Sequence, residues 1–309
     1  MRIVLVGAVE GSRVALAALV SSERPPVLVI TLPPTAADRH SDFADLSSMG
    51  RKSGISFFHT TNVNSAETLA KIASIGPDVI LVVGWSQICG RPLRELASIG
   101  TIGFHPAALP RLRGRGVIPW TILRAEQTTG STLFWLDDGV DSGPILLQRV
   151  FDVADNETAR SLYEKHLLNI REMVPQAVRM VESGNAPRIP QDDEKASYCA
   201  RRRPEDGLID WRLPAADILR FIRAVGDPYP GAFTHSGSER IYIDAADLFP
   251  NPDRYIGLPG QIQTVSATGF LVMCGDGNCV DVSAWRPETS RLRMHSHLRP
   301  GSSLEAWPK

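Results

Sequence analysis

The sequence predicts an α/β fold: a Rossmann-like, mostly parallel sheet flanked by helices, followed by a small C-terminal β-barrel domain of the OB type. Three observations support this prediction. Apolar runs without alternation recur in the first half of the chain, as in strands buried on both faces. Segments with apolar residues at helical spacing separate these runs. Short strand-like runs divided by glycine turns fill the C-terminal third, which is typical of small barrels.

Predicted strands and helices alternate through the first half. The expected strands are Arg2–Val6, Val27–Thr31, Ser56–His59, Pro77–Gly84, Gly100–His105, Ser131–Leu136 and Ile145–Val153, the last expected to be antiparallel. The expected helices are Ser12–Ser21, Ala66–Ile75, Ile118–Glu126 and Ala159–Ser183, the last of which ends at Gly184. The first strand, helix and strand make a βαβ unit with an expected right-handed crossover. Its turn, GAVEGS, lacks the G-x-G-x-x-G spacing, so a dinucleotide site is not favoured.

Two domains are expected. Residues 1–186 form the catalytic domain in this prediction, and residues 207–309 form the β domain with an irregular tail. Residues 187–206 are proline-rich, charged and without periodicity, as linkers between domains are. In the second domain, the segment Leu208–Trp211 and a helix at Ala215–Ala224 precede expected strands at Arg240–Asp244, Gly260–Val265, Gly269–Met273 and Cys279–Val282.

Composition excludes several classes of protein. The 309 residues are 43% hydrophobic and carry a formal net charge of −1, so no global field attracts nucleic acid. The four cysteines are scattered without a C-x-x-C pair, which favours a reducing compartment and no metal site. No apolar run reaches the roughly 18 residues of a membrane span. The chain enters a strand at once, so no signal peptide is expected, and a cytoplasmic location follows.

The stretch 102–148 organises the chain. His105 directly follows a predicted buried strand and opens a loop rich in proline, glycine and arginine, which leaves little room for a helix. Asp137, Asp138 and Asp141 lie among glycines in LDDGVDSG, at the end of the next strand. A histidine and an acid on neighbouring loops are what proton transfer at a carbonyl group requires.

This stretch resembles the folate-dependent formyltransferases. The similarity lies in HP-x-x-LP-x-x-RG, in the following Pro-Trp helix, and in T-G-x-T-x-F-x-x-D-x-G-x-D-x-G, and it extends from about Met1 to Val282. The family includes methionyl-tRNA formyltransferase, the glycinamide ribonucleotide enzyme and the nucleotide-sugar N-formyltransferases. The resemblance implies N10-formyltetrahydrofolate as formyl donor and an amine as acceptor. It also implies a C-terminal β domain entered through the segment that ends in PYPGAF.

Acyl transfer to an amine needs a base, an oxyanion donor and a proton source. His105 is the candidate for proton handling, because imidazole titrates near neutrality. Asp141 matches the acid of the family motif, and its charge would fix the tautomer of the ring. The alternative is that His105 is a structural histidine at the end of a strand.

Other ligand contacts follow from position in the resembled family. The loop after the strand 77–84 holds the pteridine ring, which assigns cofactor binding to Val83, Gly84, Trp85, Gln87 and Ile88, together with Asp138. Alternatively, Trp85 only caps the core.

The basic side chains of two segments have open assignments. Arg113 and Arg115 are expected to meet a phosphate group or the glutamate tail of folate, unless the loop is simply solvated. Arg201, Arg202 and Arg203 are either phosphate contacts or ordinary linker charges, and His40 is either a substrate contact or a solvated loop residue.

One position departs from the family. Gly103 stands where the family usually has the asparagine of N-x-H, whose amide donates to the formyl oxygen. Loss of one such donor typically costs about 10²–10³ in rate. Protonated His105, a backbone N–H of the Ala107–Leu109 turn, or water is expected to substitute.

We therefore expect an N-formyltransferase acting on a small amine. A nucleotide-linked amino sugar is the first choice, because the charge is near neutral and the motif wording is closer to the sugar-type branch. Methionyl-tRNA is the main alternative, and an amino-acid or siderophore amine is another. The non-enzyme alternative is a folate or sugar-nucleotide binding protein weakened by Gly103. The oligomeric state is left open, with a homodimer as one candidate.

Overall fold

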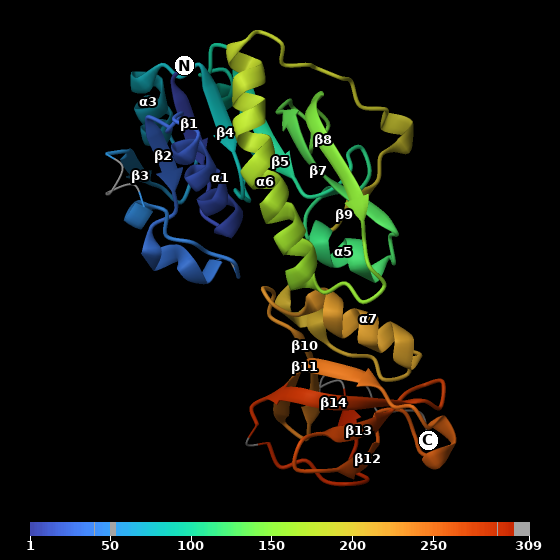
Figure 1. Ribbon diagram of the computed structural model, residues 1–309. Coiled ribbons are helices and arrows are strands. Elements are labelled where there is room, and N and C mark those ends of the chain that lie inside the picture. The colour runs from blue at the N-terminus through green and yellow to red at the C-terminus, as the bar shows by residue number, and fades with distance from the viewer. Residues whose placement is uncertain (40, 50–53, 289, 300–309) are drawn as a thin grey trace. The chain divides into compact units, whose positions relative to one another are not determined.

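The computed structural model describes residues 1–39, 41–49, 54–288 and 290–299, so His40 lies outside the described residues. The chain divides into two compact units (Figure 1). The first contains residues 1–121, 126–153 and 161–201, and the second contains residues 122–125, 154–160 and the chain from 202 onward. The expected linker at 187–206 is therefore part of the first unit as far as Arg201.

The first unit is built on a seven-stranded sheet in the order β3-β2-β1-β4-β5-β7-β8. Its strands are β1 (Ile3–Val6), β2 (Leu28–Thr31), β3 (Ser56–His59), β4 (Val79–Val82), β5 (Gly100–His105), β7 (Thr128–Trp135) and β8 (Ile145–Asp152). The five strands β3, β2, β1, β4 and β5 are parallel, and β7 and β8 are antiparallel to their neighbours. The predicted mostly parallel α/β sheet is confirmed.

Helices cover both faces of this sheet. They are α1 (Glu10–Ser21), α3 (Ala66–Ile75), α4 (Arg91–Arg94), α5 (Val117–Leu123) and α6 (Ala159–Glu182), with a 3₁₀ turn at Pro34–Arg39. Side chains of β1, β2 and β4 that point to one face form a core with Ile72 of α3 and Leu93 of α4. On the other face, α1 packs against α6 (Figure 1), because Gly11 has no side chain and leaves room for Ile170. The backbone N–H of Gly11 also donates a hydrogen bond to Tyr163 Oη at 3.2 Å.

A second, two-stranded sheet was not predicted. The strands β6 (Arg113–Gly114) and β9 (Tyr198–Cys199) pair in parallel, and a 3₁₀ turn at Asp193–Lys195 precedes β9. Residues 113–114 belong to the loop after His105, whereas residues 198–199 come from the expected linker. This pairing fixes the histidine loop to a segment more than eighty residues further along the chain.

The second unit is an antiparallel half-barrel, which confirms the predicted C-terminal β domain. Its six strands lie in the order β12-β13-β14-β11-β10-β15. They are β10 (Ala232–Ser236), β11 (Glu239–Leu248), β12 (Ile262–Val265), β13 (Phe270–Met273), β14 (Cys279–Arg286) and β15 (Leu298–Arg299), accompanied by α7 (Ala215–Val225) and by 3₁₀ turns at Pro204–Gly207 and Pro252–Arg254. A bridge between Gln261 and His297 joins the two ends of the sheet.

Within the described residues, no helix combines the length and apolar character that crossing a membrane requires. The same part of the chain contains no group of three or more His, Cys, Asp or Glu side chains that could hold a metal ion.

A buried histidine lies between α6 and the sheet. His166 is 0% exposed, and its Nδ1 contacts Ser131 Oγ at 2.8 Å. Asn169 donates to the same Ser131 oxygen at 3.1 Å, so this hydroxyl contacts two side chains of α6. The other ring nitrogen has no hydrogen-bond partner among the described residues. Burial, followed by the charges of His105 and Lys165, lowers the pKa of His166 to about 3.

This environment predicts a loss of stability in acid. Unfolded His166 takes up a proton below pH 6.5, but the folded ring stays neutral, so stability is present above pH 6.5 and is lost as the pH falls toward 3. Between pH 7 and pH 5 the loss amounts to about 2 kcal/mol. Urea denaturation at both pH values should show this component disappear in His166→Asn and persist in the exposed control His59→Asn. An unchanged pH dependence in His166→Asn would contradict the assignment.

Candidate active site

The site lies at the carboxyl ends of the parallel strands, where β1 and β4 are neighbours with crossovers in opposite directions. Open α/β sheets bind ligands at such a position. The turns after these strands pack very closely. A Cβ atom on Gly7 would lie 2.2 Å from Val83 O, and one on Gly84 would lie 2.1 Å from Val9 Cγ2. Glycine is therefore required in both turns.

His105 is the last residue of β5, beside this rim. It is 4% exposed, and its Nε2 lies 2.7 Å from Leu112 O. A carbonyl oxygen only accepts hydrogen bonds, so Nε2 carries a proton. The other nitrogen, Nδ1, lies 3.4 Å from Asp141 Oδ2. This nitrogen is the one that can take up or release a proton.

Asp141 comes from the loop between β7 and β8. Its φ of 52° is left-handed, a conformation that costs an aspartate about 1 kcal/mol. The carboxylate accepts a hydrogen bond from Gly114 N at 2.8 Å with the same Oδ2 that faces His105. The structure therefore brings together the predicted histidine and acid, and places the acid between the ring and a backbone N–H.

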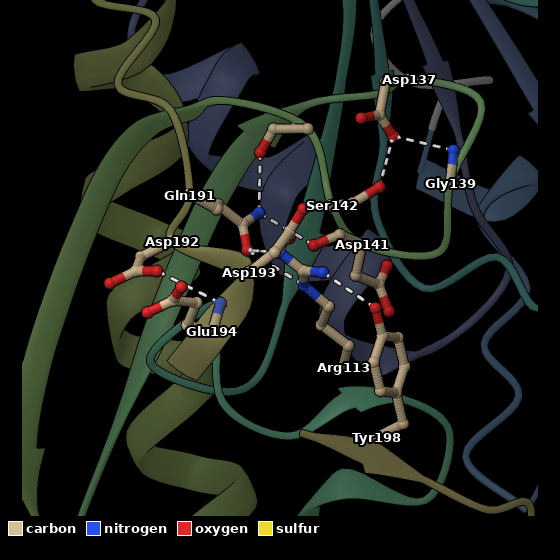
Figure 2. A network of polar contacts seen from close by, with 11 residues as sticks. Arg113, Asp137, Gly139, Asp141, Ser142, Gln191, Asp192, Asp193, Glu194 and Tyr198 are labelled. Atoms are coloured by element: carbon tan, nitrogen blue, oxygen red, sulfur yellow. Dashed lines mark hydrogen bonds and ion pairs between the residues drawn. The ribbon is translucent and has the colours of Figure 1, made fainter. Parts of the chain in front are cut away.

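A network of side chains holds the Asp141 loop from outside (Figure 2). Gln191 Nε2 donates to Asp141 O at 2.8 Å and to Gly143 O at 2.7 Å. Its Oε1 accepts from Arg113 Nη2 at 2.8 Å and Nε at 3.1 Å. The remaining donors of Arg113 reach Tyr198 Oη at 2.9 Å and Asp193 Oδ1 at 2.8 Å.

This network corrects the expectation for Arg113. The residue is 1% exposed and its guanidinium donates to protein acceptors, so it does not face a substrate anion. The alternation of side chains across the β6–β9 pair turns Arg113 inward.

Arg115 is different, because it is exposed. Among the described residues its guanidinium has no hydrogen bond or ion pair, and the same holds for Arg201. Partial desolvation, and after it the like charge of Arg201, lowers the pKa of Arg115. The like charges of Arg115 and Arg201 therefore act on each other, and neither guanidinium is paired with a carboxylate in the described part of the chain.

The loop after β4 contains the residues expected to hold the pteridine ring. Val83 is buried, Gly84 has a φ of 68°, and the indole N–H of Trp85 is buried without a hydrogen-bond partner in the described chain. The Gln87 side chain is directed to a neighbouring loop, where it donates to Thr61 O at 2.6 Å. The Ile88 side chain is 72% exposed. These contacts leave the backbone of the loop, rather than the Gln87 amide, for a ligand.

Asp138 is also exposed, and its carboxylate forms an ion pair with Arg94. Arg94 in turn donates to Cys89 O at 3.1 Å. The pair therefore connects the loop after β4 with the loop that carries Asp141.

The space at Gly103 is filled by neighbouring side chains. A Cβ atom there would lie 2.7 Å from Leu136 Cδ2 and 3.1 Å from Phe134 Cε1. An asparagine at this position would therefore require the end of the Leu136 side chain to move. Of the expected substitutes, Leu109 N–H already donates to Ala107 O at 3.1 Å.

Three contributors to the site were not predicted from sequence. Gln191 holds the Asp141 loop, Tyr198 accepts from Arg113, and the Ser197 hydroxyl accepts from Leu112 N at 2.9 Å. All three lie in the expected linker. The sequence of this segment could have indicated such a role only weakly. A lack of periodicity with polar side chains fits a loop that packs against the site as well as it fits a linker.

Comparisons with known proteins agree with this architecture. A family model described as formyl transferase matches residues 1–178, and a model described as formyl transferase, C-terminal domain, matches residues 202–298. The chain belongs to the formyl transferase family. The predicted resemblance and the predicted class of enzyme are confirmed.

Individual family members differ in their acceptors. Methionyl-tRNA formyltransferase of Symbiobacterium thermophilum is 32% identical over 279 residues, which are 90% of this chain and 85% of that protein. WlaRD, a sugar 3N-formyl transferase solved in the presence of dTDP and 5-N-formyl-THF, has a TM-score of 0.66 at 18% identity, with 92% of this chain and 97% of WlaRD covered. The N-formyltransferase from Helicobacter canadensis, solved with folinic acid and dTDP-3-aminofucose, has a TM-score of 0.65 at 18% identity, with 92% and 99% covered.

The filled space at Gly103 leads to a prediction. Gly103→Asn should lower the free energy of unfolding by about 1–3 kcal/mol, because the new side chain overpacks against Leu136 and Phe134. It should not accelerate formyl transfer. Urea denaturation and transfer rates measure both effects, and the double variant Gly103→Asn/Leu136→Ala should recover part of the stability. A single variant as stable as the parent and faster would show that the space is open after all.

Proposed function

We propose that this formyl transferase moves a formyl group from N10-formyltetrahydrofolate to the primary amine of a nucleotide-linked amino sugar. The observation that carries the proposal is the His105–Asp141 pair at the sheet rim, with Nδ1 and Oδ2 3.4 Å apart. It is joined by the neighbouring cations Arg115 and Arg201, which have no partner among the residues that the structure describes.

The loop after β4 suits a folate. Its tight turn leaves backbone groups available. The indole N–H of Trp85, which has no partner in the described part of the chain, is a donor for which a ring acceptor is the natural partner. When bound, the folate supplies the activated formyl group. The roles of Val83, Gly84, Trp85, Gln87, Ile88 and Asp138 in holding it remain predictions.

The pair His105 and Asp141 would move the protons. Leu112 O occupies the Nε2 proton, so Nδ1 accepts the proton that the attacking amine gives up. Asp141 Oδ2 then accepts a hydrogen bond from the protonated ring. The Asp141 side chain is 23% exposed, against 5% for His105, so the amine approaches from the side of the carboxylate. The ring then returns this proton to N10 of the leaving tetrahydrofolate as the bond between N10 and the formyl carbon breaks.

The acceptor is argued from charge. Arg115 and Arg201 suit a diphosphate, which favours a nucleotide-linked amine over a free amino acid or siderophore amine. The match to a methionyl-tRNA formyltransferase at 32% identity favours tRNA as the second candidate. However, residues 202–298 carry ten basic and twelve acidic side chains, and a domain without net positive charge does not attract a polyanion. A cytoplasmic location stays a prediction, with which the four free cysteines agree.

Catalysis is tested with a panel of amine acceptors and purified protein. We expect transfer to a dTDP-linked amino sugar, and a decrease of kcat by at least about 10²-fold in His105→Ala and Asp141→Asn. Folate binding should persist in both variants, because neither side chain lies in the loop after β4. Folate binding without transfer to any amine would instead support a binding protein, and preferred transfer to methionyl-tRNA would support the second candidate.

The anion site is tested by removing each cation. Arg115→Ala and Arg201→Ala should each raise the KM of the nucleotide-linked acceptor about 10- to 100-fold, since each removes a charge-assisted hydrogen bond. The KM of folate should stay within about twofold, as should both constants in the exposed control Arg171→Ala. A rise in the folate KM alone would assign the pair to the folate glutamate tail.

A further inference from the structure

Gln191 occupies an unusual position between the two halves of the site. It lies in the segment that follows α6, yet its side-chain amide makes four hydrogen bonds with the histidine loop and the Asp141 loop. Figure 2 shows this amide between the Arg113 guanidinium and the backbone of Asp141.

The orientation of the amide is determined by its neighbours. Arg113 offers only donors, so the group that faces it must be the amide oxygen. Asp141 O and Gly143 O are acceptors only, so the amide nitrogen must face them. If the Gln191 amide were rotated by 180°, its NH₂ group would face the donors of Arg113. Its oxygen would then face the two carbonyl oxygens of Asp141 and Gly143. The contact with Arg113 and the contact with the carbonyl groups therefore both require the same orientation of the amide.

This amide controls a backbone conformation that is otherwise unfavourable. Asp141 has a φ of 52°, a conformation that costs an aspartate about 1 kcal/mol. Gln191 holds the carbonyl group of Asp141 and the carbonyl group two residues later. Gly114 N–H holds the carboxylate of the same aspartate at 2.8 Å. Asp141 is thus fixed at both its backbone and its side chain.

Arg113 is the residue that keeps Gln191 in place. Its guanidinium is buried, and all of its acceptors are protein groups: the Gln191 amide, the Tyr198 hydroxyl and the carboxylate of Asp193. The Asp193 side chain is 81% exposed, so it neutralises the charge from the outer side of the network. The inner contact, to Gln191, is the one that continues to Asp141.

We propose that Gln191, oriented by Arg113, is a positioning residue for formyl transfer, because it holds the Asp141 carboxylate beside the His105 ring. The proposal rests on the roles in proton transfer proposed above for these two residues. Gln191 touches neither substrate in this account, so its removal affects kcat and leaves binding intact.

Gln191→Glu is the sharpest test. The glutamate has the same length and still accepts from Arg113, but it loses both donors to the carbonyl groups and places a carboxylate oxygen against them. A shift of about 1 Å in a catalytic group can cost about 10²-fold in rate. We expect kcat to fall about 10- to 100-fold, while the KM values of folate and of the amine acceptor stay within about twofold.

Two further variants calibrate this result. Asp193→Asn changes the exposed side of the same network and keeps the Gln191 contacts, so its kcat should stay within about twofold of the parent. Arg113→Lys keeps the positive charge but cannot donate two parallel hydrogen bonds to the Gln191 oxygen. Its kcat should therefore decrease, as in Gln191→Glu. All rates are normalised to sites titrated with a tetrahydrofolate analogue, so partly folded preparations still give a value.

The outcomes separate the two levels of the account. If Asp141→Asn transfers formyl at the parental rate, the proposed catalytic pair is wrong. If Asp141→Asn is impaired but Gln191→Glu and Asp193→Asn are alike, the catalytic pair stands and the positioning role of Gln191 is overturned. A Gln191→Glu protein that loses folate binding along with its rate would also overturn it, because that pattern indicates a general structural role.

Discussion

One strained residue, Asp141, is the constraint on which the rest of the site depends. Its backbone is left-handed, and its carboxylate lies 3.4 Å from His105 Nδ1. Such a conformation persists only when surrounding contacts determine it. Here Gln191 holds the main chain and Gly114 N–H holds the carboxylate. The hydrogen bonds that stabilise this left-handed conformation are therefore the same ones that hold the carboxylate in place for the proposed proton transfer.

This arrangement joins three distant segments of the chain. The sheet supplies His105 at the end of β5, the loop between β7 and β8 supplies Asp141, and the segment 187–201 supplies Gln191 and the β6–β9 pairing. The last segment leads directly into the second unit at Arg202. It carries Arg201, the proposed phosphate contact, only a few residues from β9. The same short stretch therefore supports the loop that follows His105 and carries the cation that we propose as a contact of the acceptor.

The sequence predicted the sheet, its long helix and the meeting of His105 with Asp141, because buried strands and a loop motif leave a clear pattern. It did not predict the role of Gln191, since an amide side chain in an irregular segment has no periodicity. Arg113 and Arg115 looked equivalent in RLRGRG, but the two-residue pairing of β6 with β9 turns one inward and leaves the other exposed. The contacts that a side chain at position 103 would make with Leu136 and Phe134 arise only in the folded sheet.

The most direct test of the account is a crystal structure of this chain with 5-formyltetrahydrofolate and a dTDP-linked amino sugar bound together. We expect the amine nitrogen to lie within about 3.5 Å of the His105–Asp141 pair, with Asp141 still left-handed and Gln191 still bound to its carbonyl oxygen. An amine bound away from this pair, or an Asp141 loop released from Gln191 in the complex, would contradict it.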